Sequence, residues 1–184
     1  MANTQLYEAR ISEEGILALR KLLGVSVSQL ISPALEVYGH FISSPSFSIS
    51  LGDNGYLVIE NSWLETPKEY IDYWSISARY SDLPKDIKVE MVEGIENVMQ
   101  FPVSSVHIQP ASRIIKISIY EAKWSDSECE ESVIYDQAVV FQQEEGKRFC
   151  IMANQSIADL LDFTNHEEEI KAIIGEIACR KEIE

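Results

Sequence analysis

The stretch Ile115-Lys116-Ile117-Ser118-Ile119 decides the fold class that this sequence favours. Isoleucine recurs at every second position and alternates with Lys116 and Ser118, which is the period of a strand with one buried face. The same alternation covers residues 74–80, and shorter strand-like runs occupy residues 56–59 and 87–91. Two further runs, residues 133–143 and 147–152, flank Glu144-Glu145-Gly146. A short connection that contains glycine predicts a β-hairpin there.

A helix is predicted near the amino terminus. Ser12 is a suitable N-cap, and Glu13 and Glu14 follow it where the positive end of the helix dipole favours carboxylates. Gly24 is predicted to end this helix. Its apolar stripe consists of Ile16, Leu19, Leu22 and Leu23.

A second, amphipathic helix is predicted near the carboxyl terminus. Thr164-x-x-Glu167 has the spacing of a capping box, and Arg180 and Lys181 are expected in the last turn. Four isoleucines then follow the i, i+3, i+4, i+7 pattern of a helix that lies on a core. They are Ile170, Ile173, Ile174 and Ile177.

These elements predict an α+β fold. It is a mainly antiparallel β-sheet with an N-terminal helix and a C-terminal amphipathic helix packed on it, because helical patterns between the strands are mostly absent. Residues 1–184 are expected to form a single globular domain, since the chain is short for two. Turns are predicted at residues 109–112, and a single helical turn is predicted at residues 66–69.

Charge narrows the classes of partner. The formal net charge is −15, and residues 126–184 carry fifteen acidic and five basic side chains. Such a field repels phosphates and anionic membranes and attracts basic proteins. The sequence therefore predicts a basic protein partner, with no nucleic acid and no membrane as partners, and leaves the oligomeric state open.

The cysteines indicate a reducing compartment. Cys129, Cys150 and Cys179 form no C-x-x-C pair and are too far apart in sequence for a disulfide scaffold. The amino terminus also lacks the pattern of a secretory signal. We expect a cytoplasmic protein.

No cofactor, no metal ion and no catalytic residue is predicted. The glycines do not match a phosphate-binding loop, and His40, His107 and His166 are not part of a nucleophile or zinc motif. A pair of Cys150 with His107 would require neighbouring strands.

The partner-binding residues that the sequence suggests fall into two groups. One is the acidic run that contains Asp126, Glu128, Glu130 and Glu131, which would steer a basic protein towards the chain. Its alternative interpretation is a solvated hairpin loop. A calcium loop does not fit its spacing. The other group is Tyr73 and Trp74, expected as exposed aromatic anchors, with burial in the sheet core as the alternative.

Two resemblances follow from these residues. Residues 135–174, with Gly146-Lys147-Arg148-Phe149 at a hairpin turn, are similar to stretches of bacterial proteins, and we identify no family from them. As a class, small acidic proteins without catalytic motifs resemble toxin-immunity proteins, which neutralise basic nucleases by covering them. The resemblance implies a non-enzymatic, acidic protein-binding module. The alternatives are a small hydrolase or transferase whose site is assembled from distant residues, a subunit of a larger assembly, or a mimic of DNA.

Overall fold

The computed structural model describes residues 5–52, 55–68, 70–86, 89–91, 98–100, 104–125 and 131–184. Its two helices are α1 (Glu13–Arg20) and α2 (Glu167–Glu176). The strands of the first half are β1 (Gln5–Ala9), β2 (Ser26–Ser32), β3 (Glu36–Tyr38), β4 (Phe41–Ser44), β5 (Ser46–Ser50), β6 (Tyr56–Glu60), β7 (Trp63–Glu65), β8 (Asp72–Trp74) and β9 (Ser77–Ser81). Those of the second half are β10 (Val89–Met91), β11 (Val98–Gln100), β12 (Ser104–Ser125), β13 (Glu131–Gln143), β14 (Arg148–Ala153), β15 (Leu161–Thr164) and β16 (Ala178–Ile183).

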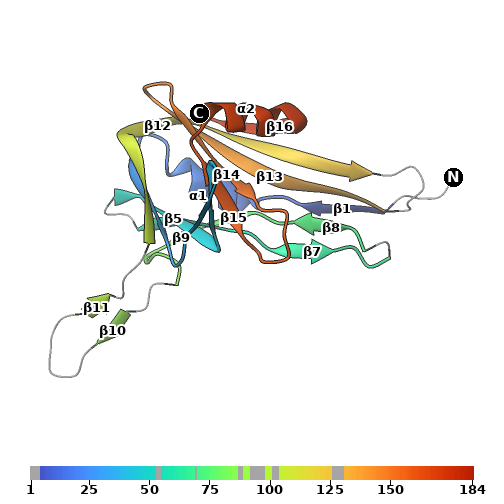
Figure 1. Cartoon of the computed structure of the whole chain (residues 1–184), viewed down its shortest axis with the longest axis horizontal. Coiled ribbons are helices and arrows are strands. Elements are labelled where there is room, and N and C mark those ends of the chain that lie inside the picture. The colour runs from blue at the N-terminus through green and yellow to red at the C-terminus, as the bar shows by residue number, and fades with distance from the viewer. Residues whose placement is uncertain are drawn as a thin grey trace.

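A large sheet organises the chain, in the order β3-β4-β15-β14-β13-β12-β2-β5-β6-β9 (Figure 1). Strand β16 also pairs with β12, and β1 pairs in parallel with β13, whereas the other strand pairs are antiparallel. The predicted α+β class, dominated by antiparallel sheet, is therefore confirmed. Strand β12 joins the two halves of the sheet, because its first part pairs with β2 and its second part with β13.

The main core lies between the two halves of the sheet and includes α1. Ser12 caps α1 as predicted, since its Oγ accepts a hydrogen bond from the amide of Gly15 at 3.1 Å. Gly15 is required there, because a Cβ atom at this position would lie 2.9 Å from the carbonyl oxygen of Ala78 in β9. The helix ends at Arg20, before the expected end at Gly24. Gly24 instead adopts a positive φ of 78° and donates a hydrogen bond to the carbonyl of Ile114.

Helix α2 lies on the opposite face of β13 and β14. Ile170 is fully buried there against Ala138, Val140 and Cys150. The predicted capping box is wrong, because Thr164 belongs to β15 and its Oγ1 accepts a hydrogen bond from the amide of His166, which is the N-cap residue. The placement of Arg180 and Lys181 in the last turn is also wrong, since both lie in β16.

The pairing of strand β12 with its neighbours contains irregularities that the sequence did not reveal. Its register on β13 shifts between Ile114 and Lys116, so Ile115 is an extra residue that is 45% exposed, while Ile117 and Ile119 are buried as predicted. A bulge of this kind reverses the face on which a side chain lies. The turn predicted at residues 109–112 does not reverse the chain, because β12 continues through these residues. Their effect is a shift in the register of β12 on β2.

The remaining expectations were met in part. The hairpin between β13 and β14 turns at residues 144–146 as predicted, with Gly146 at a φ of 80°. The stretch at residues 74–80 is divided between β8 and β9, and its alternating burial holds for Trp74, Ile76 and Ala78 but not for Tyr80, which is exposed. The helical turn expected at residues 66–69 is a hairpin turn between β7 and β8, in which Thr66 and Ile71 hydrogen-bond to each other; Glu69 lies outside the described residues. For the strand expected at residues 87–91, residues 87 and 88 also lie outside them, and β10 covers the rest.

Candidate functional site

Of the four residues in the predicted acidic run, only Glu131 lies among the residues that the structure describes. Asp126, Glu128 and Glu130 lie outside the described residues. Glu131 begins β13 and is 0% exposed, so the expectation that it steers a partner from the surface is wrong. Its carboxylate accepts hydrogen bonds from the hydroxyl of Tyr7 at 2.9 Å and from the amide of Lys68 at 3.3 Å. Glu131 thus ties β1 and the turn between β7 and β8 to β13, and its role is structural.

Trp74 also has a structural role. Its side chain is only 8% exposed, its ring centroid lies 5.7 Å from that of Tyr135, and its Nε1 donates a hydrogen bond to the carbonyl of Ser156 at 3.1 Å. The interpretation of Trp74 as an exposed anchor is therefore wrong. Tyr73 is half-buried and packs partly against the main core, opposite Leu64 in the hairpin of β7 and β8. The two candidate aromatic anchors therefore do not form one exposed patch.

His107 does not form a nucleophilic site with Cys150. His107 lies in the part of β12 that pairs with β2, whereas Cys150 lies in β14, which β13 separates from β12. On the exposed face of β12, His107 Nε2 lies 3.4 Å from Ser105 Oγ, and no carboxylate contacts this ring among the described residues. The rings of His40 and His166 contact each other instead, with centroids 4.0 Å apart.

Cys150 is predicted to be chemically inert in the folded protein. Burial raises the pKa of its thiol to about 12. At pH 7 only about one such thiol in 10⁵ is ionised, and the thiolate is the reactive form. Alkylation with iodoacetamide at neutral pH is expected to modify the exposed Cys179 and to leave Cys150 unmodified until urea unfolds the chain. Peptide mass spectrometry measures this, and modification of both thiols at similar rates in the native state would contradict the prediction.

A polar cluster surrounds Asp162 in β15. Its carboxylate accepts hydrogen bonds from the hydroxyl of Tyr38 at 2.6 Å, from Ser43 Oγ, and from Asn154 Nδ2 at 2.9 and 3.0 Å. Burial, together with the hydrogen bond to Asp162, raises the pKa of Tyr38. Tyr38 therefore stays protonated as a donor, and the cluster satisfies the buried carboxylate of Asp162 and links β3, β4 and β15 rather than forming a reactive centre.

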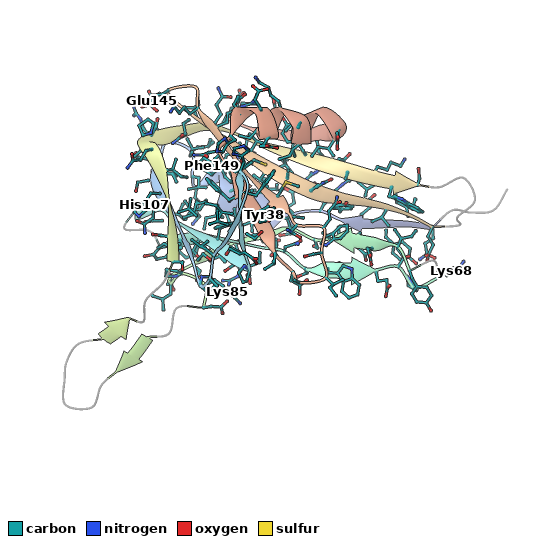
Figure 2. All side chains as sticks on the ribbon, in the orientation of Figure 1. Tyr38, Lys68, Lys85, His107, Glu145 and Phe149 are labelled. Carbon is teal, nitrogen blue, oxygen red and sulfur yellow. The ribbon has the colours of Figure 1, made fainter. Side chains whose placement is uncertain are left out.

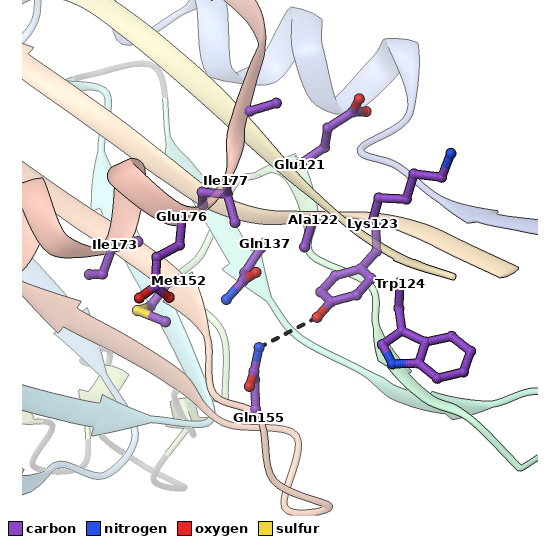
Figure 3. Close-up of a pocket in the computed structure, with 12 residues that line it drawn as sticks. Glu121, Ala122, Lys123, Trp124, Gln137, Met152, Gln155, Ile173, Glu176 and Ile177 are labelled. Atoms are coloured by element: carbon purple, nitrogen blue, oxygen red, sulfur yellow. Dashed lines mark hydrogen bonds between the residues drawn. The ribbon is translucent and has the colours of Figure 1, made fainter. Parts of the chain in front are cut away.

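An open groove of about 770 Å³ lies at the end of α2 (Figure 3). On one side of it lie Ile173, Ile177 and Met152, and Trp124 lies on the other. Trp124 is 40% exposed, so the groove includes an exposed aromatic side chain that the sequence interpretation did not identify. Its position at the end of an alternating strand was the only sequence signal, and that signal does not separate exposed from buried aromatics.

The groove runs along the edge of a strand. Its lining includes four consecutive residues of β12, from Glu121 to Trp124. Consecutive residues of a strand point to opposite faces, so a hollow that touches all four reaches the edge of β12. Tyr135 and Gln137 of β13 and Met152 of β14 also line the groove, so it extends across these strands as well. Strand β16 covers this side of β12 only from Ile117 to Glu121, and among the described residues no strand pairs with the remainder. The edge at residues 122–125, here called the β12 edge, is therefore open.

Carboxylates flank the groove. Glu121 lies 3.0 Å from Arg10, which also pairs with Glu8 at 3.1 Å, so one guanidinium serves two carboxylates. Glu176 ends α2, is exposed, and forms no ion pair with any described residue. Lys123 is the only basic side chain that lines the groove within the described part of the chain. The arrangement suits a cationic or polar ligand more than an anionic one.

The described residues also limit other kinds of site. They include no group of three or more His, Cys, Asp or Glu side chains that could hold a metal ion. No helix among them is sufficiently long and apolar to cross a membrane. Comparison with protein-family models, with curated proteins and with solved structures finds no match to this chain.

Proposed function

We propose that this chain is a non-enzymatic, acidic protein-binding module that engages a basic partner protein in the cytoplasm. An immunity-type protein that covers a nuclease toxin is its most concrete form. The observation that carries the proposal is the groove with the exposed Trp124, on a chain whose formal net charge is −15. Exposed aromatic side chains are enriched where protein partners gain affinity, and carboxylates around them attract a basic partner.

Asp126, Glu128 and Glu130 supply the steering charge in this proposal. They follow Ser125, the last residue of β12, and precede Glu131, the first residue of β13. In sequence, the three charges are one, three and five residues from Ser125 at the open end of β12. Charges so placed raise the rate at which a basic protein encounters the groove without contacting it in the complex.

The test begins with capture of binding proteins from native-source lysate at low salt, followed by purification of the basic protein that elutes at moderate ionic strength. Its association rate is then measured by stopped flow for the wild type and for the double variant Asp126→Lys and Glu128→Lys. We expect the rate at low salt to fall about tenfold and its salt dependence to flatten.

A matched control carries Glu36→Lys and Glu145→Lys, which change the charge equally. Both residues are exposed, and Glu145 lies in the turn at the opposite end of β13 from Glu131. Figure 2 shows Glu145 at the opposite end of the molecule from Lys68, whose amide contacts Glu131. The control should associate nearly as fast as the wild type. An unchanged rate in the first variant, an equal fall in the control, or the capture of no basic protein would each overturn the proposal.

A further inference from the structure

We propose that the β12 edge accepts an extended, basic segment of the partner protein as an added strand, placed in line with β16. This inference rests on the proposed function and specifies how the partner binds. It would make main-chain hydrogen bonds, rather than a preformed side-chain pocket alone, the basis of affinity.

The geometry of β12 supports an added strand. Its pairing with β16 ends at Glu121 opposite Ala178, whereas its pairing with β13 continues to Ser125 opposite Ser132. In an antiparallel pair every second residue directs both its N–H and C=O groups away from its partner. Every second residue from Ala122 to Ser125 therefore presents a main-chain donor and acceptor on the side that β16 leaves open.

The length and apolar wall of the groove set the size of the segment. Four residues of strand extend about 13 Å, so a segment of about that length fills the β12 edge. One of its faces would contact Ile173 of α2 and Ile177, the extended residue that follows the helix, and both side chains are only half-buried by this chain. The helix thus supplies a contact for alternate side chains of the segment.

The carboxylates of α2 beside the groove favour a segment with basic side chains. Glu169, Ile173 and Glu176 follow helical spacing on α2, so the carboxylates lie on either side of an apolar wall residue. No described residue forms an ion pair with either glutamate. A lysine or arginine can lay its methylene stem on Ile173 and bring its charged end to Glu176. A second copy of this chain fits less well, since each copy carries a net charge of −15.

The probe for this inference is a short capped peptide of alternating lysine and valine, added to the isotopically labelled full chain. Amide hydrogen exchange is followed by NMR. When the peptide is bound in excess, we expect the amides of residues 122–125 that point away from β13 to exchange more slowly. Their exchange rates should fall by at least about tenfold. Matched peptides replace valine by proline, which removes the main-chain donors, or lysine by glutamate, which reverses the charge. Neither should protect the β12 edge.

The matched variants are Glu176→Lys and, as the control, Glu145→Lys. Both sites are exposed, so both variants should fold normally. The first should weaken binding of the lysine–valine peptide about tenfold, and the control should leave it within about twofold. Three results would each overturn the inference. They are slowed exchange that does not include residues 122–125, equal binding of the proline peptide, and self-association of the chain that blocks the edge.

The two proposals fail in different ways. If the captured basic partner binds with steered kinetics but does not protect the β12 edge, the added-strand inference is wrong and the proposed function stands. If neither the partner nor the peptide binds, both are wrong.

Discussion

Replacing Arg180 by alanine is expected to lower the free energy of unfolding by about 3–5 kcal/mol, because it leaves a buried carboxylate without its cation. The carboxylate belongs to Asp136, which is 0% exposed. Arg180 donates to it through Nε at 2.8 Å and through Nη2 at 2.7 Å, and the amide of Ile11 donates to it at 2.8 Å. These contacts join β16, β13 and the segment that leads into α1.

Bulges bring this pair together. Gln137 is an extra residue of β13 where that strand pairs with β12. Arg180 is likewise an extra residue of β16 where that strand pairs with β12. A bulge redirects the side chain of the residue that it inserts. Arg180 is thereby directed at Asp136 across β12, and the hydrogen bonds to Asp136 raise the pKa of Arg180.

Urea unfolding followed by circular dichroism measures the effect. Lys181→Ala is the matched control, since Lys181 lies 3.9 Å from the exposed Glu13 and should contribute about 0.5 kcal/mol or less. Adding Asp136→Asn to Arg180→Ala should restore part of the loss, because the amide oxygen still accepts from Ile11 and no charge is buried. A double variant less stable than Arg180→Ala alone would contradict this account.

Trp74→Ala is expected to lower the free energy of unfolding by about 3–5 kcal/mol, whereas Trp124→Ala should lower it by about 1 kcal/mol or less. Trp74 is 8% exposed and packs on Tyr135 in the core, while Trp124 is 40% exposed at the groove. The first change opens a cavity where the hairpin of β7 and β8 packs on β13, and the second removes a side chain that is already partly exposed to solvent.

Binding should show the reverse order. At a temperature where both variants are folded, Trp124→Ala should weaken binding of the lysine–valine peptide about tenfold, and Trp74→Ala should leave it nearly unchanged. Urea unfolding and peptide titration measure the two effects. The interpretation of Trp74 as a partner anchor would be reinstated if Trp74→Ala lost binding and kept its stability.

The strands, the amino-terminal cap and the hairpin at residues 144–146 could be predicted because their signals are local. Alternation sets which side chains share a face within one strand, as it does for Ile117 and Ile119. A cap such as Ser12 depends on its own helical turn. The failures concern registers and ends: Ile115 is displaced by a bulge, and Arg180 belongs to a strand although its charge suits the end of a helix.

Exposure was decided by the tertiary structure alone. Glu131 is acidic within an acidic run, yet the packing of β1 and the turn between β7 and β8 buries it. Trp74 and Trp124 both occupy strands, and only the neighbours supplied by distant segments make one a core residue and the other a groove residue. The open edge of β12 likewise depends on where β16 stops. The sequence by itself determined the fold class and the sign of the charge, because composition and period carry both. The groove and its contacts needed the folded chain, because they are made between residues far apart in sequence.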